Sequence, residues 1–381
     1  MKYHMPTEVF FGGGMISDLG RVLGRRPVFS RPLLVTDREI EAAGIAAKVL
    51  RQLSPLAVFN EIEPNPRNTT VDRGGDLARK LEPDLIIGLG GGSVLDAAKA
   101  IALLATNSGR IEDYEGREKY REAPLPVLAI PTTCGTGSEV TWVSIITHAG
   151  RRIKMSIKGP LMYPAVALVD PDLLETLPRH LVASTGLDAL THAIEAFTAK
   201  PATAFTDALA LEALRLIFGS LPEAYRDIGK NSTAREELML GSVLAGMAFV
   251  NSDVGAVHCL AETIGALYDT PHGVANAVLL PFVMEFNLAA AEAKYARIAA
   301  VVGSESKEQE AATWLIHRIQ AVSRALSIPG FRDLGIPESD FELIAQRSFE
   351  NNSNPSNPRE AAAADYLGIL RRASLAICLP S

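Results

Sequence analysis

The stretch DLIIGLGGGSVLDAAK, residues 84–99, decides the fold of the first half of the chain. Its apolar run, residues 85–89, has the length of a buried strand, and three consecutive glycines follow at residues 90–92. Glycines expose their backbone N–H groups because no Cβ covers them, and a helical pattern begins directly after them. A strand, a glycine turn and a helix in this order predict one unit of an α/β domain. The N-terminus of that helix is suited to binding a pyrophosphate.

The helix after the glycines is expected to carry its own cap. Ser93 is suited to the N-cap position, with Asp96 three residues later, as in a capping box. The glycine pattern differs from the G-x-G-x-x-G fingerprint of dinucleotide-binding folds. A tight turn with a purely structural role is therefore the alternative at this point.

Four further apolar runs predict strands elsewhere in the first half, at residues 32–37, 56–59, 126–131 and 165–170. Helical patterns separate them, which is typical of βαβ units and a mostly parallel sheet. Beyond Leu177 and Pro178 the strand signals stop, and helical patterns rich in Ala, Leu and Glu continue to the end. We therefore predict an α/β domain over residues 1–179 and an all-α domain over residues 180–381.

The second half contains two clusters of metal-ligand residue types. GLDALTHAIEAF, residues 186–197, places Asp188 four residues before His192, so both side chains share one helix face about 6 Å apart. HCLAETIGALYDTPHGVANAVLLP, residues 258–281, places His258 fourteen residues before His272. An unbroken helix would separate these two by roughly 21 Å. We therefore expect the chain to turn back at residues 268–271, since Pro271 cannot continue a helix.

One carboxylate and three imidazoles form a nitrogen and oxygen donor set that suits Fe²⁺ or Zn²⁺ and leaves room for a substrate oxygen. A lone histidine is more often structural than a ligand. The two spaced pairs together are a stronger signal. The set therefore predicts a metal site built from Asp188, His192, His258 and His272.

A second glycine turn, PTTCGTGSE at residues 131–139, also follows a predicted strand. Its hydroxyl groups and glycines suit contacts with a ribose, a phosphate or a nicotinamide amide, although such loops are common. Asp37, at the end of another strand, has two open interpretations. It accepts hydrogen bonds from ribose hydroxyls, which favours NAD over NADP, or it caps the next helix.

Composition restricts the partners and the compartment. The 381 residues carry a net charge of −7, which argues against a nucleic-acid partner because phosphate binding needs clustered Lys and Arg. The N-terminus lacks the apolar core of a signal peptide, and we expect no run of about 18 apolar residues to span a membrane. Three cysteines, Cys134, Cys259 and Cys378, lack metal or disulfide spacing and favour the reducing cytoplasm.

Taken together, these motifs resemble the iron-containing (group III) alcohol dehydrogenases, which have the dehydroquinate-synthase-like fold. The resemblance spans nearly the whole chain, with its motifs in the family's order. The matching segments are GGGSVLDAAK at 90–99, PTTCGTGSEVT at 131–141, GLDALTHAIEAF at 186–197, LAGMAFVNSDVGAVH at 244–258, HGVANAVLLP at 272–281 and NPR at 357–359.

The resemblance implies an NAD-binding domain followed by a helical metal-binding domain, with the active site in the cleft between them. It places the metal ligands at Asp188, His192, His258 and His272, with ferrous iron usual and zinc possible. It assigns Asp37 to NAD preference and the remaining cofactor contacts to Gly91, Gly92, Ser93, Asp96, Thr132, Thr133, Thr136, Thr141 and Lys154. It also implies a small alcohol or aldehyde as substrate and a homodimer or larger homo-oligomer.

Two positions depart from the family pattern. Many members have a second histidine four residues after the third metal ligand, where this chain has Glu262, and a histidine where it has Phe282. Glu262 follows His258 by one helical turn. A proton relay, a contact to a polar substrate and an ion pair with a nearby cation are all open for it, so we list it as a candidate catalytic residue.

The reaction that we expect is hydride transfer between NAD(H) and the substrate, with the metal as a Lewis acid on the substrate oxygen. The alternatives are an NAD- and metal-dependent lyase or cyclase resembling dehydroquinate synthase, and a silent NAD-binding homologue. The lyase would need several basic residues for a charged substrate, and the sequence shows no such cluster near the ligands.

Overall fold

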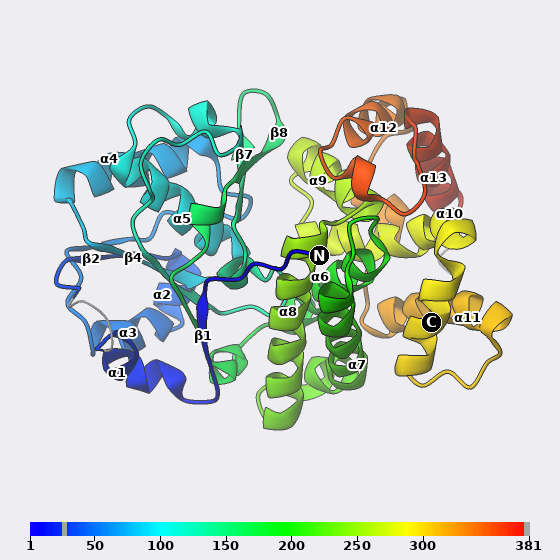
Figure 1. The fold of residues 1–381 in the computed structure, drawn as a ribbon, viewed down its shortest axis with the longest axis horizontal. Coiled ribbons are helices and arrows are strands. Elements are labelled where there is room, and N and C mark those ends of the chain that lie inside the picture. The colour runs from blue at the N-terminus through cyan, green and yellow to red at the C-terminus, as the bar shows by residue number, and fades with distance from the viewer. Residues whose placement is uncertain (25–28, 377–381) are drawn as a thin grey trace. The chain divides into compact units, whose positions relative to one another are not determined.

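The computed structural model describes residues 1–24 and 29–376, so Cys378 lies outside the described residues. The chain divides into two compact units, which Figure 1 shows as a ribbon. One unit is Met5–Leu177 and contains the sheets. The other comprises Pro178–Ser381 together with Met1–His4 and is built from helices.

The larger sheet of the α/β unit has the strand order β1-β9-β6-β4-β2-β3 among the described residues, and every neighbouring pair is parallel. This confirms the predicted parallel sheet, and each of the five predicted runs forms a strand. Strand β1, next to β9 at the edge, was not predicted. The strands are β1 (Glu8–Phe11), β2 (Pro32–Val35), β3 (Ala57–Phe59), β4 (Leu85–Gly90), β6 (Val127–Pro131) and β9 (Val166–Val169).

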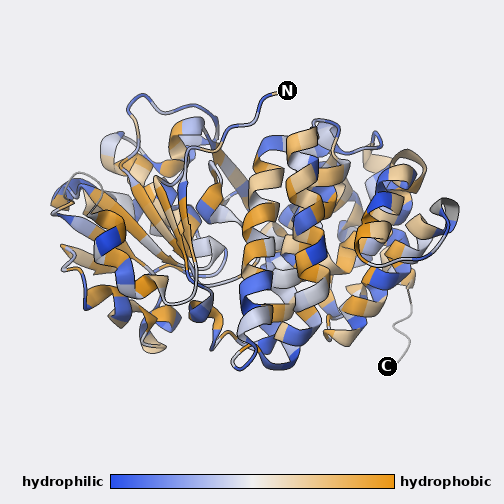
Figure 2. Ribbon diagram, turned by 60° about the horizontal axis from the view of Figure 1, so that its bottom comes forward, coloured by the Kyte–Doolittle hydropathy of each residue, from blue (hydrophilic) through white to orange (hydrophobic). Residues whose placement is uncertain are grey.

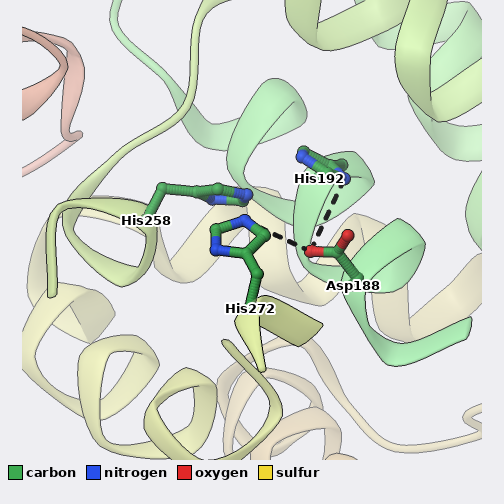
Figure 3. Close-up of side chains that lie close together, drawn as sticks. All are labelled: Asp188, His192, His258 and His272. Atoms are coloured by element: carbon green, nitrogen blue, oxygen red, sulfur yellow. Dashed lines mark ion pairs between the residues drawn. The ribbon is translucent and has the colours of Figure 1, made fainter. Parts of the chain in front are cut away.

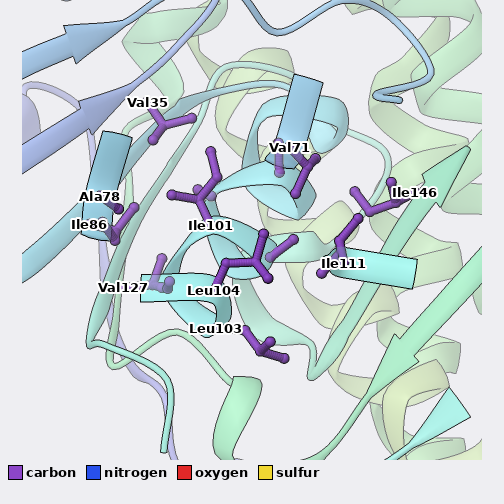
Figure 4. Close-up of a cluster of buried hydrophobic side chains, with 14 of the residues drawn as sticks. Val35, Val71, Ala78, Ile86, Ile101, Leu103, Leu104, Ile111, Val127 and Ile146 are labelled. Atoms are coloured by element: carbon purple, nitrogen blue, oxygen red, sulfur yellow. The ribbon is translucent and has the colours of Figure 1, made fainter. Parts of the chain in front are cut away.

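Helices pack on both faces of this sheet because alternate strand residues point to opposite sides. Ile86 belongs to a core cluster with residues of α4 (Asn68–Leu81) and α5 (Gly92–Thr106), part of which Figure 4 shows. Its neighbours Leu85 and Ile87 belong to the opposite cluster, with residues of α1 (Leu19–Leu23) and α3 (Ile45–Leu50). Burial on both faces explains why these strands are continuous apolar runs, which are coloured orange in Figure 2.

A smaller sheet, with strands on both sides of the second glycine turn in the sequence, was not predicted. Strands β7 (Val143–His148) and β8 (Ile153–Lys158) pair antiparallel, and β5 (Gly116–Arg117) pairs with β8 in parallel. Strand β7 also packs beside helix α5, which begins at the first glycine turn. The small sheet is thus linked to both glycine turns.

The helical unit confirms the expected all-α second half. In the residues that the structure describes, no strand occurs beyond β9. The helices are α6 (Arg179–Thr198), α7 (Ala204–Asp227), α8 (Ser232–Ser252), α9 (Ala256–Tyr268), α10 (His272–Val301), α11 (Glu308–Ala325), α12 (Phe341–Phe349) and α13 (Ala363–Leu375).

Helix α10 qualifies one expectation from the sequence. By length and composition it is apolar enough to cross a membrane, although the sequence suggested no segment of that kind. However, 67% of its most apolar window is buried within the structure. We therefore interpret α10 as a core helix of the helical unit.

Candidate metal centre and cofactor loops

Helix α6 supplies the first two candidate ligands. Asp188 and His192 lie one turn apart on this helix, as predicted, and both side chains are buried. His192 Nδ1 lies 3.9 Å from Asp188 Oδ1. The imidazole of His192 stacks on Phe249 of α8 with 4.3 Å between ring centroids, and this contact restricts its orientation.

The chain turns back between the other two histidines, also as predicted. Helix α9 ends at Tyr268, Asp269 has a left-handed φ of 55°, and α10 begins at His272. The next residue is glycine for a steric reason. A Cβ at Gly273 would lie 2.3 Å from the carbonyl oxygen of Ser184 on α6. The glycine therefore allows α10 to approach α6 closely at the level of Asp188.

These elements bring the four side chains together, as Figure 3 shows. One potential ligand atom from each of them lies within 4.8 Å of the other three. His272 Nε2 lies 3.7 Å from Asp188 Oδ1. The donor set, three nitrogens and one oxygen, fits a divalent iron or zinc ion.

The cluster is closed on most sides and open at one. The side chains of Asp188, His192 and His258 are 2%, 6% and 4% exposed, whereas that of His272 is 32% exposed. Access to the cluster is therefore greatest beside His272.

Glu195 is a candidate supporting residue of the cluster that the sequence did not reveal. It is buried on α6, and its carboxylate lies 2.5 Å from His258 Nδ1. It also accepts hydrogen bonds from the backbone N–H groups of Gly255 at 2.9 Å and Val257 at 2.8 Å. Burial disfavours the charged imidazole, but the bond and charge of Glu195 outweigh it and raise the pKa of His258. With a proton on Nδ1, His258 presents the lone pair of Nε2 to the cluster.

Asn276 is the second residue that was missed. It lies one turn after His272 on α10 and is fully buried. Its Nδ2 donates to Asp188 Oδ1 at 2.6 Å and lies 3.1 Å from His272 Nε2 and 3.3 Å from His258 Nε2. Its Oδ1 is buried without a hydrogen-bond partner. Sequence spacing places both residues on the helix faces that carry the ligands, but it does not show which groups they contact. Glu195 is seven positions after Asp188 on α6, and Asn276 is four after His272.

Glu262 lies one turn beyond His258 on α9, as expected, but outside the four-residue cluster. Its carboxylate accepts a hydrogen bond from Asn351 Nδ2 at 2.7 Å. Asn351 belongs to the Asn-, Ser- and Pro-rich loop after α12. Among the described residues Glu262 forms no ion pair, which weighs against the cation-pairing interpretation.

The two glycine turns of the α/β unit pack directly against each other. A Cβ at Gly91 would lie 3.1 Å from Thr133 Cγ2, and one at Gly92 would lie 2.4 Å from Thr136 Cγ2. Thr132 N also donates to the carbonyl oxygen of Gly90 at 3.0 Å. The glycines thus permit a contact between the two predicted cofactor loops that larger residues would block.

The predicted capping box is wrong. The N-cap of α5 is Gly91, and no side chain caps the helix. Asp96 instead turns towards the second loop, where it accepts hydrogen bonds from Ser138 Oγ at 2.6 Å and Ile145 N at 3.0 Å. Residues 138 and 145 are more than forty positions away in sequence, so local spacing did not reveal this role for Asp96.

The other predicted cofactor residues have varied surroundings. Asp37 is the N-cap of α2 (Arg38–Ala42) and accepts from Ile40 N at 2.7 Å, which confirms the capping interpretation. Lys154 donates to Asn65 Oδ1 at 2.6 Å. Thr141 is buried, and its hydroxyl group lies 3.4 Å from Lys99 Nζ. Thr141 therefore contacts the interior of the α/β unit.

A parallel α/β unit and a helical unit with an Asp-His₃ cluster are the arrangement expected of a metal-dependent enzyme that uses a nucleotide cofactor. The chain belongs to the iron-containing alcohol dehydrogenase family. Residues 6–171 match the family model described as iron-containing alcohol dehydrogenase, and residues 182–374 match its C-terminal model. This confirms the resemblance seen in the sequence.

Relatives of known activity are similar over their whole length. The NAD-dependent methanol dehydrogenase of Bacillus methanolicus is 37% identical over 98% of this chain and 99% of the relative. The 1,3-propanediol dehydrogenase of Citrobacter freundii is 40% identical over 97% of this chain and 98% of the relative. A crystal structure of a 1,3-propanediol oxidoreductase has a TM-score of 0.92 at 39% identity, covering 98% of this chain and 99% of that one. The chain is accordingly an oxidoreductase of the alcohol dehydrogenase type, for which the family implies NAD and iron.

Proposed function

We propose that this protein transfers hydride reversibly between NAD(H) and a small alcohol or its aldehyde, at a divalent iron site formed by Asp188, His192, His258 and His272. The observation that carries the proposal is the approach of these four donors to within 4.8 Å of one another. Methanol and 1,3-propanediol, in the names of the relatives, support a small primary alcohol as the substrate class. Zinc suits the same donor set and is a second metal to test.

The bound cofactors would supply Lewis acidity at the substrate oxygen and a hydride donor or acceptor. The residues of the chain orient and restrict this chemistry. Glu195 and Asn276 position His258 and Asp188 by hydrogen bonds, and the stacking of Phe249 positions His192. Burial of three of the four ligands keeps water from those sides and leaves the side of His272 open to substrate.

We assign NAD binding to the α/β domain, residues 1–179, and metal binding to residues 180–381. The contact between the two glycine turns supports a single phosphate-binding surface. Its proposed contacts are Gly91, Gly92, Ser93, Asp96, Thr132, Thr133, Thr136 and Thr141, with Lys154 beside them. Asp37 keeps the ribose role as well as its cap, because a carboxylate has more lone pairs than the single bond to Ile40 uses.

Glu262 is proposed to act in catalysis, either by relaying a proton or by contacting a polar group of the substrate. Its partner Asn351 is neutral, so this hydrogen bond orients the carboxylate without cancelling its charge. Glu262→Gln should lower turnover and change the ranking of substrates, since it keeps the shape and removes the charge. A variant with the turnover and substrate ranking of the wild type would exclude Glu262 from the active site.

We also propose a cytoplasmic homodimer or larger homo-oligomer. Cys134 and Cys259 are buried as thiols, which agrees with a reducing compartment. Sedimentation of the purified protein tests the assembly. A monomer at assay concentration would contradict that part of the proposal.

The decisive experiment is NADH oxidation against a panel of small aldehydes, with metal-free protein reconstituted without oxygen. Fe²⁺, Zn²⁺ and no metal form the three arms. Metal-dependent loss of NADH absorbance is the expected result, and the preferred aldehyde identifies the substrate. NADH binding without turnover in any arm would contradict the proposed reaction and favour the lyase or the silent homologue.

A further inference from the structure

Lys99 is a buried amine that the proposed reaction does not use. It lies on α5, seven residues after Gly92, and its side chain is 1% exposed. A buried ammonium group is strongly destabilising unless it is paired and hydrogen-bonded. The partners of Lys99 therefore indicate what the residue stabilises.

The partners come from the end of the second cofactor loop and from the residues that lead from it into β7. Nζ of Lys99 donates to the carbonyl oxygens of Ser138 at 3.1 Å and Thr141 at 3.4 Å, and to that of Val143. It also lies 3.4 Å from the hydroxyl oxygen of Thr141. A single ammonium group thus forms hydrogen bonds with three backbone carbonyls of residues 138–143, where the loop leads into β7.

Asp96, one turn earlier on α5, completes the arrangement. Its Oδ1 lies 3.1 Å from Lys99 Nζ and accepts from Ser138 Oγ at 2.6 Å. Its Oδ2 accepts from Ile145 N at 3.0 Å, and its carbonyl oxygen accepts from Ser144 Oγ at 2.7 Å. Lys99 and Asp96 therefore each form hydrogen bonds both to the second loop and to β7.

A second buried acid lies in the same loop. Glu139 is 2% exposed, and burial raises its pKa to about 7, although the charge of Lys99 opposes this rise. The ionisable groups Asp96, Lys99 and Glu139 are therefore close together and largely withdrawn from solvent. The same loop also packs Thr136 against Gly92.

We propose that Lys99 is a positioning residue for the dinucleotide. Its ammonium group holds residues 138–143 against α5 and thereby fixes the second loop over the first at Gly92. This inference rests on the proposed function, because it takes both loops as the NAD site. The small, tetrahedral ammonium group suits converging carbonyls from several directions, whereas the planar fork of arginine suits carboxylates.

Lys99→Met tests this role, because methionine keeps the apolar stem and removes the three donors. Lys80→Met is the matched control, since Lys80 is exposed on α4 of the same unit. We expect NADH to bind at least about tenfold more weakly to Lys99→Met, from the loss of hydrogen bonds to a charged group. The KM for NADH should rise accordingly, while the kcat at saturating NADH and the affinity for Co²⁺ stay at control values. A folded Lys99→Met protein that binds NADH as tightly as Lys80→Met would overturn the proposal.

A second measurement, thermal unfolding with NADH, tests the proposal even if Lys99→Met folds poorly. NADH stabilises the folded protein by an amount that grows with the logarithm of its concentration relative to Kd, so thermal unfolding with increasing NADH yields a dissociation constant for a destabilised variant. Lys99→Met that stays unfolded at saturating NADH would assign the residue to folding alone and refute the positioning role. Failure of the wild type to bind NADH would instead refute the proposed function, and the two failures are therefore distinguishable.

Discussion

Glu195→Gln is expected to weaken metal binding while the helical unit stays folded. The carboxylate of Glu195 receives three N–H groups, from Gly255, Val257 and His258. Glutamine has the same shape but offers one acceptor oxygen and one NH₂ group. In either orientation of the amide, at least one of these donors then faces another donor.

The magnitude follows from the role of the outer partner. Loss of the outer partner of a metal-binding histidine typically lowers metal affinity about 10- to 100-fold, or roughly 1.4 to 2.7 kcal/mol. One buried N–H group left without an acceptor separately lowers the folding stability by about 1–3 kcal/mol. Because Glu195 is buried, solvent does not replace the missing acceptor.

Competition between the protein and a chelator for Co²⁺ measures the effect directly, and the visible spectrum of bound Co²⁺ reports the ligand geometry. Glu223→Gln is the control, because Glu223 is only partly buried on α7 and pairs with Arg226. NADH binding should be the same in both variants. If Glu195→Gln has an unchanged Co²⁺ affinity and spectrum, Glu195 does not position His258, and the reasoning is refuted.

Three further outcomes test other parts of the structure. His258→Ala should abolish metal retention and turnover while NADH binding remains measurable, and normal turnover without metal would exclude the proposed site. Gly273→Ala should destabilise the helical unit by about 1–3 kcal/mol and weaken Co²⁺ binding, because its Cβ meets the Ser184 carbonyl; denaturant titration checks this, and an unchanged midpoint would contradict it. Burial raises the pKa of Glu139 from 4.5 to about 7, so the folded chain retains a proton that the unfolded chain releases. The stabilisation linked to protonation of Glu139 is therefore fully present below pH 4.5 and is lost as the pH rises through about 7. Urea unfolding of Glu139→Gln should lack this part of the pH dependence, and an identical pH profile would place the titration elsewhere.

The main features of the fold could be predicted from the sequence because local residue patterns determine them. Strands buried on both faces, such as residues 85–89, must be continuously apolar, and the glycines after them mark the start of a helix. The edge strand β1 and the small sheet of β7 and β8 carried no such signal. Strand β8, IKMSIK, mixes buried and partly exposed residues instead of forming a continuous apolar run. Its pairing depends on β7 rather than on its own composition.

The metal cluster was predictable for a similar reason, and its supporting residues were not. Asp188 and His192 share a helix face by spacing, and Pro271 marks the turn that returns His272 to His258. Glu195 accepts a hydrogen bond from Gly255, which is sixty residues away in the sequence, so only the tertiary structure reveals its partners. The capping prediction for Ser93 and Asp96 failed because the long-range bond to Ser138 prevailed over the local one.

The carboxylate of Glu195 connects the metal centre with the first turn of α9, because the same group that orients His258 also accepts from Gly255 N and Val257 N. Opening of that turn would break the hydrogen bonds of these two amides to Glu195 and displace His258 at the same time. A cation bound to His258 opposes the opening, so hydrogen exchange at Gly255 and Val257 should slow as the site fills. The exchange rates of these two amides should therefore report how much metal is bound, even when the enzyme has no substrate.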